Sequence, residues 1–315
     1  MPDCNGEIAR DMWSRIIPQI AFDSEVVLNP MLALSALHLH AHSPGNAPMS
    51  LAISRYLDRT LVNHREALQS FDGKLTEQVW LSAILLSNIY WLLAHQQRPD
   101  EPYELPFHGW RMMHGVTTLF LRRYSLLTEL GYEWYGHVSA SAMETHYKLS
   151  FDSAEHLETL KDDLADLMQR FEHQSRTNEE KIAYSEAQAY VIAFYRAYLR
   201  GTDTRVLRMF IGTMPIKCPP TYLKLLERHD PLAMAIMARL LVLLVPLESA
   251  WWINGIGDYE VVARDIRGIY ELIPEHLRWC MDWPRKVLSG EIDLNRQSTK
   301  AQAKASRPSS QEKFT

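Results

Sequence analysis

Apolar residues recur three or four positions apart along most of this 315-residue chain, and alternating strand-like patterns are hard to find. That spacing places apolar side chains on one face of an α-helix, which can then pack against other helices. Segment 76–94 is a clear example, and Thr76 is its candidate N-cap. The residues on its apolar face are Val79, Ala83, Leu86, Tyr90 and Leu93. The pattern predicts an all-α fold.

The same periodicity predicts a series of helices, separated by breaks rich in proline and glycine. The expected segments are about 7–20, 24–41, 50–71, 76–94, 107–123, 153–171, 178–199 and 221–228, a helix capped by Asp230 with Pro231 at its first position, a helix capped by Asp258 that runs to about 272, and short helices that begin at Pro274 and Pro284. The polar region 132–152 supports no assignment. Because no solenoid-length repeat is present, we expect a single multi-helix domain over residues 1–294.

The overall composition supplies a core but no footprint for nucleic acid. Hydrophobic residues make up 47% of the chain. The 33 Lys and Arg residues against 38 Asp and Glu residues give a formal charge of -5 without long single-sign blocks, which disfavours direct nucleic-acid binding. The longest apolar stretch, 232–247, is interrupted by Arg239 and Pro246 and is shorter than the ~20 apolar residues that span a bilayer. We therefore expect a buried helix there and no membrane span.

The two ends of the sequence differ in composition. The first residues contain no apolar run of the signal-peptide type. From about residue 295 the chain is polar and locally basic, which predicts a disordered tail over residues 295–315. That tail could serve import or bind acidic partners, but a solvated terminus is the interpretation that we favour.

Cysteine and histidine residues do not suggest a metal site. Cys4, Cys218 and Cys280 lie far apart and form no CxxC pair, which argues against a disulfide framework and a thiolate zinc site and favours an intracellular protein. His38 and His42 would share one helix face at a spacing that can hold a metal, but no acid or cysteine lies at a matching distance. We expect no metal, and interpret His38 as a hydrogen-bonded interior residue.

Catalytic motifs are likewise missing from the sequence. It contains no nucleophile elbow, phosphate loop or zinc-protease helix. Ser139, Ser141, Glu144 and His146 could supply a hydroxyl, a base and an acid, although proximity in sequence does not define geometry. We assign no catalytic residue and no cofactor, and an enzyme is the less favoured class.

Two ordered sets of short motifs carry a family resemblance. The first set is Asn29–Leu39, Tyr56, His64, Ala67–Leu68, Phe71 and Leu81–Leu86. The second set is Pro219–Leu223, His229–Ala233, Trp251–Gly257 and Arg278–Pro284. In order and separation both resemble the C-terminal regulatory domain of fungal zinc-cluster transcription factors of the sterol uptake control group. The resemblance covers roughly residues 10–290.

The resemblance implies an internal hydrophobic pocket that binds a lipid such as ergosterol, whose occupancy controls release of the factor to the nucleus. Such a pocket needs an apolar wall, aromatic faces and one or two polar groups that orient a hydroxyl. The candidate pocket residues are Trp80, Tyr90, Trp110, Met113, Phe120, Met237, Leu241, Trp251, Trp252, Gly255 and Gly257. Each apolar member could instead be an ordinary core residue, and the two glycines could form a pocket mouth, a hinge or a simple turn. His108, Arg111 and His114 flank Trp110 and could contact a polar ligand head, but we favour a partly exposed helix face.

One departure from the family pattern shapes the functional hypothesis. Its members carry a binuclear zinc cluster of six closely spaced cysteines, which Cys4, Cys218 and Cys280 cannot provide. We therefore expect a truncated regulatory domain or, preferably, a stand-alone homologue. It would sense a hydrophobic small molecule in the nucleus, the cytoplasm or both, and act through that ligand, a full-length factor or a second copy of itself. The alternative is an enzyme of fungal secondary metabolism, for example a cyclase, that uses the same pocket.

Overall fold

The computed structural model describes residues 11–43, 45–69, 75–95, 102–131, 154–173, 176–199, 201–202, 207, 218–247 and 261–294. Within these ranges the chain forms helices and turns and no strand, which confirms the predicted all-α class. The chain divides into two compact units. Unit 1 comprises Met1–Thr145, Thr213–Pro219 and Ser249–Gly268, and unit 2 comprises His146–Gly212, Pro220–Glu248 and Ile269–Thr315.

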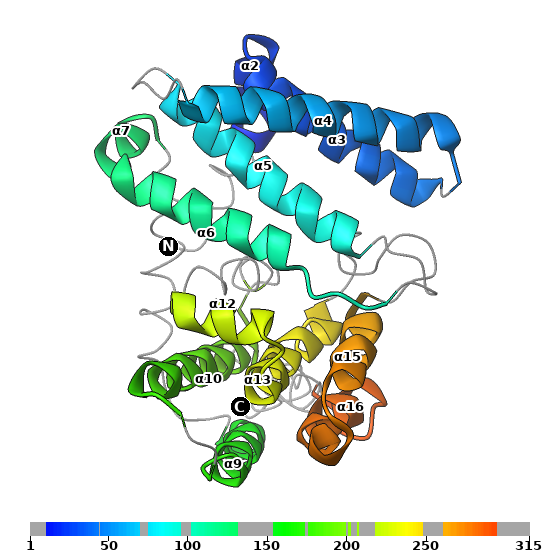
Figure 1. Ribbon diagram of the computed structural model, residues 1–315, viewed down its shortest axis with the longest axis vertical. Helices are drawn as coiled ribbons and strands as arrows, with labels where there is room; N and C mark the ends of the chain where they lie inside the picture. The colour runs from blue at the N-terminus through cyan, green and yellow to red at the C-terminus, as the bar shows by residue number, and fades with distance from the viewer. Residues whose placement is uncertain are drawn as a thin grey trace, which may run out of the picture. The chain divides into compact units, whose positions relative to one another are not determined.

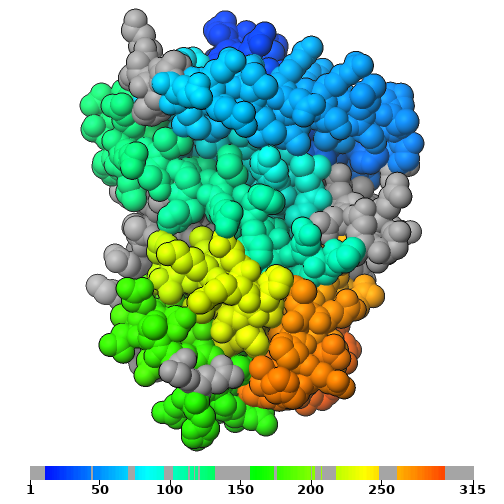
Figure 2. Space-filling view, in the orientation of Figure 1, coloured from blue at the N-terminus to red at the C-terminus, as the bar shows by residue number. Residues whose placement is uncertain are grey.

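Unit 1 is built around helix α5. Its helices are η1 (Met12–Ile16), α2 (Ile17–Phe22), α3 (Glu25–His42), α4 (Ala47–Gln69), α5 (Thr76–Ala94), α6 (Phe107–Arg122), α7 (Tyr124–Glu129) and the first part of α15 (Val261–Leu272). Helices α3 and α4 lie side by side, and α5 contacts both of them and also α6 (Figure 1). In the space-filling view, side chains of α4 and α6 form much of the surface of unit 1 on the face shown (Figure 2).

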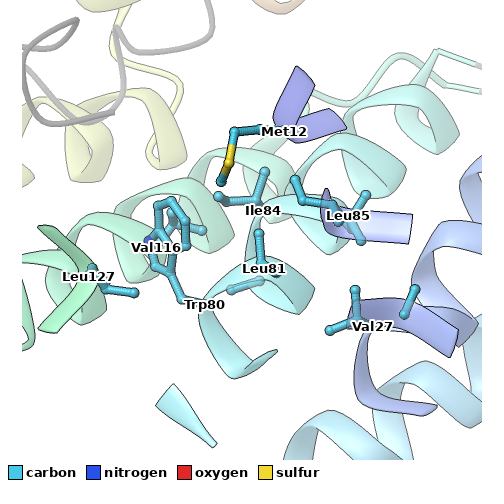
Figure 3. Close-up of a cluster of buried hydrophobic side chains, with 11 residues drawn as sticks. Met12, Val27, Trp80, Leu81, Ile84, Leu85, Val116 and Leu127 are labelled. Atoms are coloured by element: carbon cyan, nitrogen blue, oxygen red, sulfur yellow. The ribbon is translucent and has the colours of Figure 1, made fainter. Parts of the chain in front are cut away.

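The environment of α5 differs from the single apolar face that periodicity predicts. Figure 3 shows Trp80, fully buried, in a cluster with Leu81 and Ile84 of its own helix and with Val116 and Leu127 from α6 and α7. Ser82 and Ser87 are also buried. Because neighbours cover α5 on several sides, these two polar residues are enclosed as well, and each has a hydrogen-bond partner. Ser87 Oγ donates to the carbonyl of Ile84 at 2.7 Å, and Ser82 Oγ lies 3.0 Å from His64 Nδ1.

Unit 2 is built around helix α13. Its helices are α9 (Ala154–Arg170), α10 (Asn178–Leu199), α12 (Pro220–Glu227), α13 (Pro231–Val242), η2 (Val245–Leu247), the end of α15, η3 (Glu275–Met281) and α16 (Asp282–Leu288). Helix α13 contacts α9, α10, α12, η3 and α16, and every residue from Leu232 to Val242 is buried. The prediction of a buried helix in this apolar stretch is confirmed.

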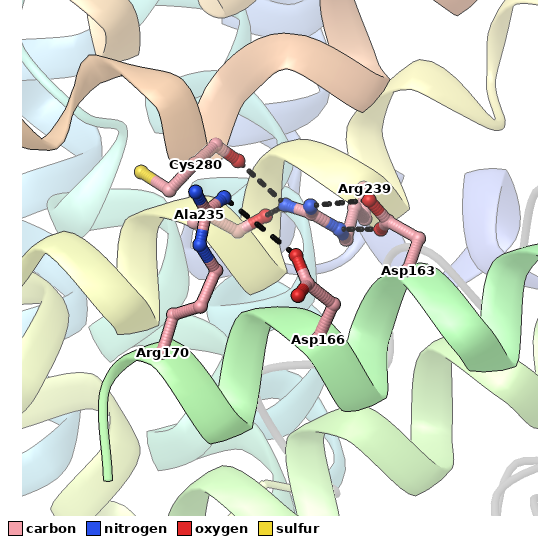
Figure 4. A network of polar contacts seen from close by, with 6 residues as sticks. All are labelled: Asp163, Asp166, Arg170, Ala235, Arg239 and Cys280. Carbon is pink, nitrogen blue, oxygen red and sulfur yellow. Dashed lines mark hydrogen bonds and ion pairs between the residues drawn. The ribbon is translucent and has the colours of Figure 1, made fainter.

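Arg239 is the charged residue inside this apolar helix, and its guanidinium is nearly saturated with hydrogen bonds (Figure 4). Its side chain is 2% exposed. Nε and Nη2 donate to the two carboxylate oxygens of Asp163 at 2.5 and 3.1 Å, and Nη1 donates to the carbonyls of Ala235 and Cys280, each at 2.9 Å. The bidentate pair ties α9 to α13, and the bond to Cys280 adds η3. A buried charge is tolerated here because it is paired and hydrogen-bonded.

Several helix ends follow their predicted local signals. Asp230 caps α13, because its Oδ1 accepts from the backbone N–H of Ala233 at 2.9 Å with Pro231 in the first position. Gly201 has φ +76° directly after α10. Helix α4 begins at Ala47, earlier than predicted, because Asn46 Oδ1 accepts from the N–H of Met49 and so caps the helix inside the proline-rich break.

Other ends differ from the prediction. Thr76 is the buried first residue of α5, and Leu75 rather than Thr76 occupies the N-cap position. Helix α16 begins at Asp282 rather than at Pro284. Proline is tolerated in the first turn of a helix, because the backbone N–H that it lacks would have no hydrogen-bond partner within the helix there. A separate helix, α7, follows α6 and was not predicted. Residues 70–73, 132–152, 203, 258 and 295–315, which include predicted helix ends and caps, an unassigned region and the predicted tail, lie outside the described residues.

Among the described residues, no single helix has both the length and the apolar character that a membrane span requires. Helix α12 and the segment Pro231–Leu247 pass that test only together, and they are bent by 105°.

Candidate functional site

The predicted pocket residues fall into three groups. Tyr90 and Trp110 belong to the packed pair α5 and α6, whereas Trp80 lies farther back along α5 in the apolar cluster. Met237 and Leu241 are buried in α13 of unit 2. Met113 and Phe120 lie on α6, but their side chains are outside the described residues, as are Trp251, Trp252, Gly255 and Gly257. A common pocket of all these residues stays a prediction.

Helices α5 and α6 approach each other closely at Gly109. A Cβ atom at this position would lie 3.1 Å from the backbone N of Trp91 and 3.2 Å from the carbonyl of Ser87, so the close approach favours glycine. The approach sets the neighbouring rings against each other. The Tyr90 and His108 ring centroids are 5.8 Å apart, and Trp110 meets Phe107 edge to face at 5.6 Å. Of the predicted set, Tyr90 and Trp110 are therefore brought into one region.

A buried polar cluster adjoins this region at the end of α5. His95 Nδ1 donates to the carbonyl of Trp91 at 2.7 Å, and its Nε2 donates to Asp265 Oδ2 at 3.1 Å. The Tyr103 hydroxyl donates to the other oxygen, Oδ1 of Asp265, at 3.1 Å. Arg264 Nη1 donates to the carbonyl of His95 at 3.4 Å. Residues from α5, the segment 102–106 and α15 thus meet within unit 1, and we name His95, Tyr103 and Asp265 the polar cluster.

The geometry of the polar cluster makes His95 an imidazolium. Both of its ring nitrogens face oxygens that can only accept, so both must carry a proton. Burial alone lowers the pKa of His95, but the Asp265 carboxylate and the bond to the Trp91 carbonyl outweigh it, and the net pKa is raised. Burial, with the nearby Asp265 charge, raises the pKa of Tyr103 well above its usual value. The cluster therefore holds a positively charged His95, with a proton on each ring nitrogen, and a neutral phenol at Tyr103.

Two close contacts hold the polar cluster in place. The Tyr103 ring lies directly on Gly268 of α15, where a Cβ atom would come within 2.0 Å of the ring carbon Cγ. The Trp91 indole packs against His95 with ring centroids 4.5 Å apart. An aromatic face beside an imidazolium adds a cation–π contact to the ion pair. The Trp91 Nε1 atom itself is buried and makes no hydrogen bond to any residue that the structure describes.

Sequence reasoning missed all three members of the polar cluster, although one signal for it exists. Val261, Val262, Ile266 and Ile269 form the buried stripe of α15, and Asp265 falls on that stripe. An acid at a core position needs a buried partner, so this position marks a polar site. The partner itself could not be found from the sequence, because His95 is 170 residues away.

The remaining predicted features are placed as follows. His38 and His42 face each other on α3 with ring centroids 4.7 Å apart, and no group of three metal-ligating side chains occurs in the part of the chain that is described. Cys218 and Cys280 are buried thiols outside any disulfide, and burial raises the pKa of Cys280 to about 11. A thiol of this kind is a poor nucleophile. The Ser139, Ser141, Glu144 and His146 group lies outside the described residues.

Comparisons with known proteins support the family resemblance at a coarse level. Residues 4–133 match the family model described as fungal specific transcription factor domain. The chain is 21% identical over 298 residues to a Zn(2)-C6 fungal-type transcription factor of Gibberella zeae, which covers 90% of this chain and 58% of the relative. It is 27% identical over 120 residues to the Zn(2)-C6 fungal-type transcription factor afumD of Aspergillus fumigatus, covering 38% of this chain and 32% of that protein. No solved structure matches significantly.

The matched range 4–133 contains α5, α6, His95 and Tyr103, while Asp265 lies beyond it. The chain spans less than two thirds of either relative's length. Assignment to the sterol uptake control group and the absence of a zinc cluster stay predictions. Taken together, the comparisons show that this chain is similar to fungal transcription factors, with residues 4–133 matching a fungal specific transcription factor domain.

Proposed function

We propose that the chain regulates transcription by sensing a hydrophobic small molecule of sterol type. The observation that carries this proposal is the match of residues 4–133 to a fungal specific transcription factor domain, continued by similarity to a zinc-cluster factor over 90% of the chain. With a net charge of -5 and no basic block, the domain acts through its ligand and a partner, either a full-length factor or a second copy. We place this action in the nucleus, with or without a cytoplasmic pool.

The region around Tyr90 and Trp110 is the binding region that we propose. It offers the aromatic faces that a rigid ring system needs, and the polar cluster borders it. A site of this type combines a mostly apolar wall with a few fixed polar groups. Trp80 would contribute to the core behind this region rather than to the ligand contact, since its side chain is enclosed by the apolar cluster.

Ergosterol binding to the purified chain tests the proposal. We expect saturable binding and a rise of several degrees in melting temperature, because a ligand that binds only the folded state at 100 times its Kd adds about 2.7 kcal/mol. Tyr90→Ala should weaken binding, whereas Tyr124→Ala, the same change at an exposed residue of α7 in the same unit, should not. The sensor proposal is wrong if ergosterol does not stabilise the chain and native mass spectrometry finds no retained lipid.

Deletion of the gene separates regulation from catalysis. A regulator should change the transcripts of a whole set of genes together. Accumulation of one metabolite with unchanged transcripts would instead indicate an enzyme.

A further inference from the structure

The indole N–H of Trp91 is a buried donor that makes no hydrogen bond within the described part of the chain. Its Nε1 atom is shielded from solvent. An indole nitrogen can only donate, so water or an acceptor must supply the missing bond. Leaving such a group unpaired is unfavourable, and an unsatisfied group in a native fold calls for an explanation.

The acceptors nearest to this indole in the sequence and in the polar cluster each receive a hydrogen bond from another group. The carbonyl of Trp91 itself accepts from His95 Nδ1. Asp265 accepts from His95 through Oδ2 and from Tyr103 through Oδ1. The Trp91 ring meanwhile packs on the His95 imidazolium, which restrains the indole. The donor is therefore held in place beside a polar cluster with which its Nε1 makes no hydrogen bond.

We propose that Trp91 Nε1–H binds an oxygen acceptor on the ligand, a hydroxyl or a keto oxygen. The inference rests on the proposed function and adds to it which chemical group of the ligand the site recognises. An ammonium group has no lone pair to offer, so amine head groups are excluded. A keto oxygen accepts as well as a hydroxyl does, so the oxidised and the reduced ligand should both be recognised, and a hydrocarbon should not.

The neighbouring residues make Trp91 a better candidate than Trp283, whose indole nitrogen is also buried. Trp283, in α16 of unit 2, is 6% exposed, and its Nε1 makes no hydrogen bond to the described residues. Trp91 instead directly follows Tyr90 on α5, lies against the close approach of α6 at Gly109 and contacts the polar cluster. Trp283 thus provides a matched control, because its indole nitrogen is also buried but lies in unit 2, not in the unit that contains the proposed binding region.

The test compares three probes on the full chain: ergosterol, its 3-keto counterpart and its 3-deoxy counterpart. We expect the wild type to bind the two oxygen-bearing probes roughly 3- to 10-fold more tightly than the 3-deoxy probe, the effect of one neutral hydrogen bond. Trp91→Phe should remove that preference, whereas Trp283→Phe should keep it. Melting temperatures of both variants without ligand show whether each is folded.

A second measurement uses the wild type alone and does not depend on how a variant folds. In a ¹⁵N-labelled sample of the chain, which has nine tryptophans, the Trp91 indole resonance should move downfield with ergosterol and the 3-keto probe but not with the 3-deoxy probe. The Trp283 resonance should stay in place.

The outcomes separate the two proposals. If ergosterol binds but Trp91→Phe keeps the full preference for oxygen, or the indole resonance responds equally to all three probes, the inference is wrong and the proposed function stands. If the wild type binds none of the probes, the sensor function fails and the inference fails with it.

Discussion

His95 carries a proton inside the protein because its surroundings compensate for burial. The Asp265 carboxylate faces Nε2, the Trp91 carbonyl faces Nδ1, and the Trp91 ring covers one side. His64 shows the opposite outcome in the same unit, since burial without a charged partner lowers its pKa to about 4. Two buried histidines thus differ in charge because only one of them meets an acid.

Replacing Asp265 with Asn tests the charge on His95. Since the folded pKa of His95 is raised, its contribution to stability is fully present below about pH 6.5 and is lost as pH rises through the folded pKa. We expect Asp265→Asn to cost about 3–5 kcal/mol at pH 6.5, because a buried charge loses its partner, and less at pH 9. Urea unfolding at both values measures this.

The pH window of that experiment excludes His64, whose lowered pKa affects stability only between about pH 4 and 6.5. Asp58→Asn, at an exposed position of α4, is the matched control and should be nearly neutral. An equal cost of Asp265→Asn at pH 6.5 and pH 9 would contradict the expected loss of the His95 charge between these two pH values.

At the scale of elements, Gly268 allows helix α15 to pack closely against Tyr103 of the segment 102–106. Gly268→Ala should destabilise the protein by about 1–3 kcal/mol, because the new methyl group displaces the Tyr103 ring and its hydroxyl from Asp265. Gly115→Ala, in the middle of α6 with open space around the position, should stabilise by up to about 1 kcal/mol. Thermal unfolding of the two variants compares them, and the same sign for both would contradict the close contact at Gly268.

At the scale of the whole molecule, unit 1 is assembled from separated stretches of the chain. The family match ends at residue 133, yet Asp265 completes the polar cluster. A fragment of residues 1–145 leaves His95 and Tyr103 without their acid. We therefore expect it to unfold less cooperatively than the full chain, with a weakened near-UV circular dichroism spectrum.

The cause of that loss can be checked within the fragment. His95→Leu combined with Tyr103→Phe removes the two stranded polar groups and should recover part of the near-UV signal. A fragment that unfolds as cooperatively as the full chain without these changes would show that Asp265 is dispensable.

Local signals in the sequence determined the helices of this protein. The bounds 76–94 and 178–199 were predicted as observed, and so was the Asp230 cap with Pro231 behind it. These features depend on residues within a few positions of one another, so periodicity and capping chemistry suffice to predict them.

The tertiary structure decided the rest. Only contacts between elements show that neighbours enclose the polar positions of α5, that Arg239 pairs with Asp163, and that His95 meets Asp265 across 170 residues. Of the predicted pocket residues, Tyr90 and Trp110 lie in the region beside the polar cluster, while the cluster itself was not predicted. The physical reason is that periodicity records which face of a helix is apolar, whereas a buried polar pair depends on which distant element covers that face.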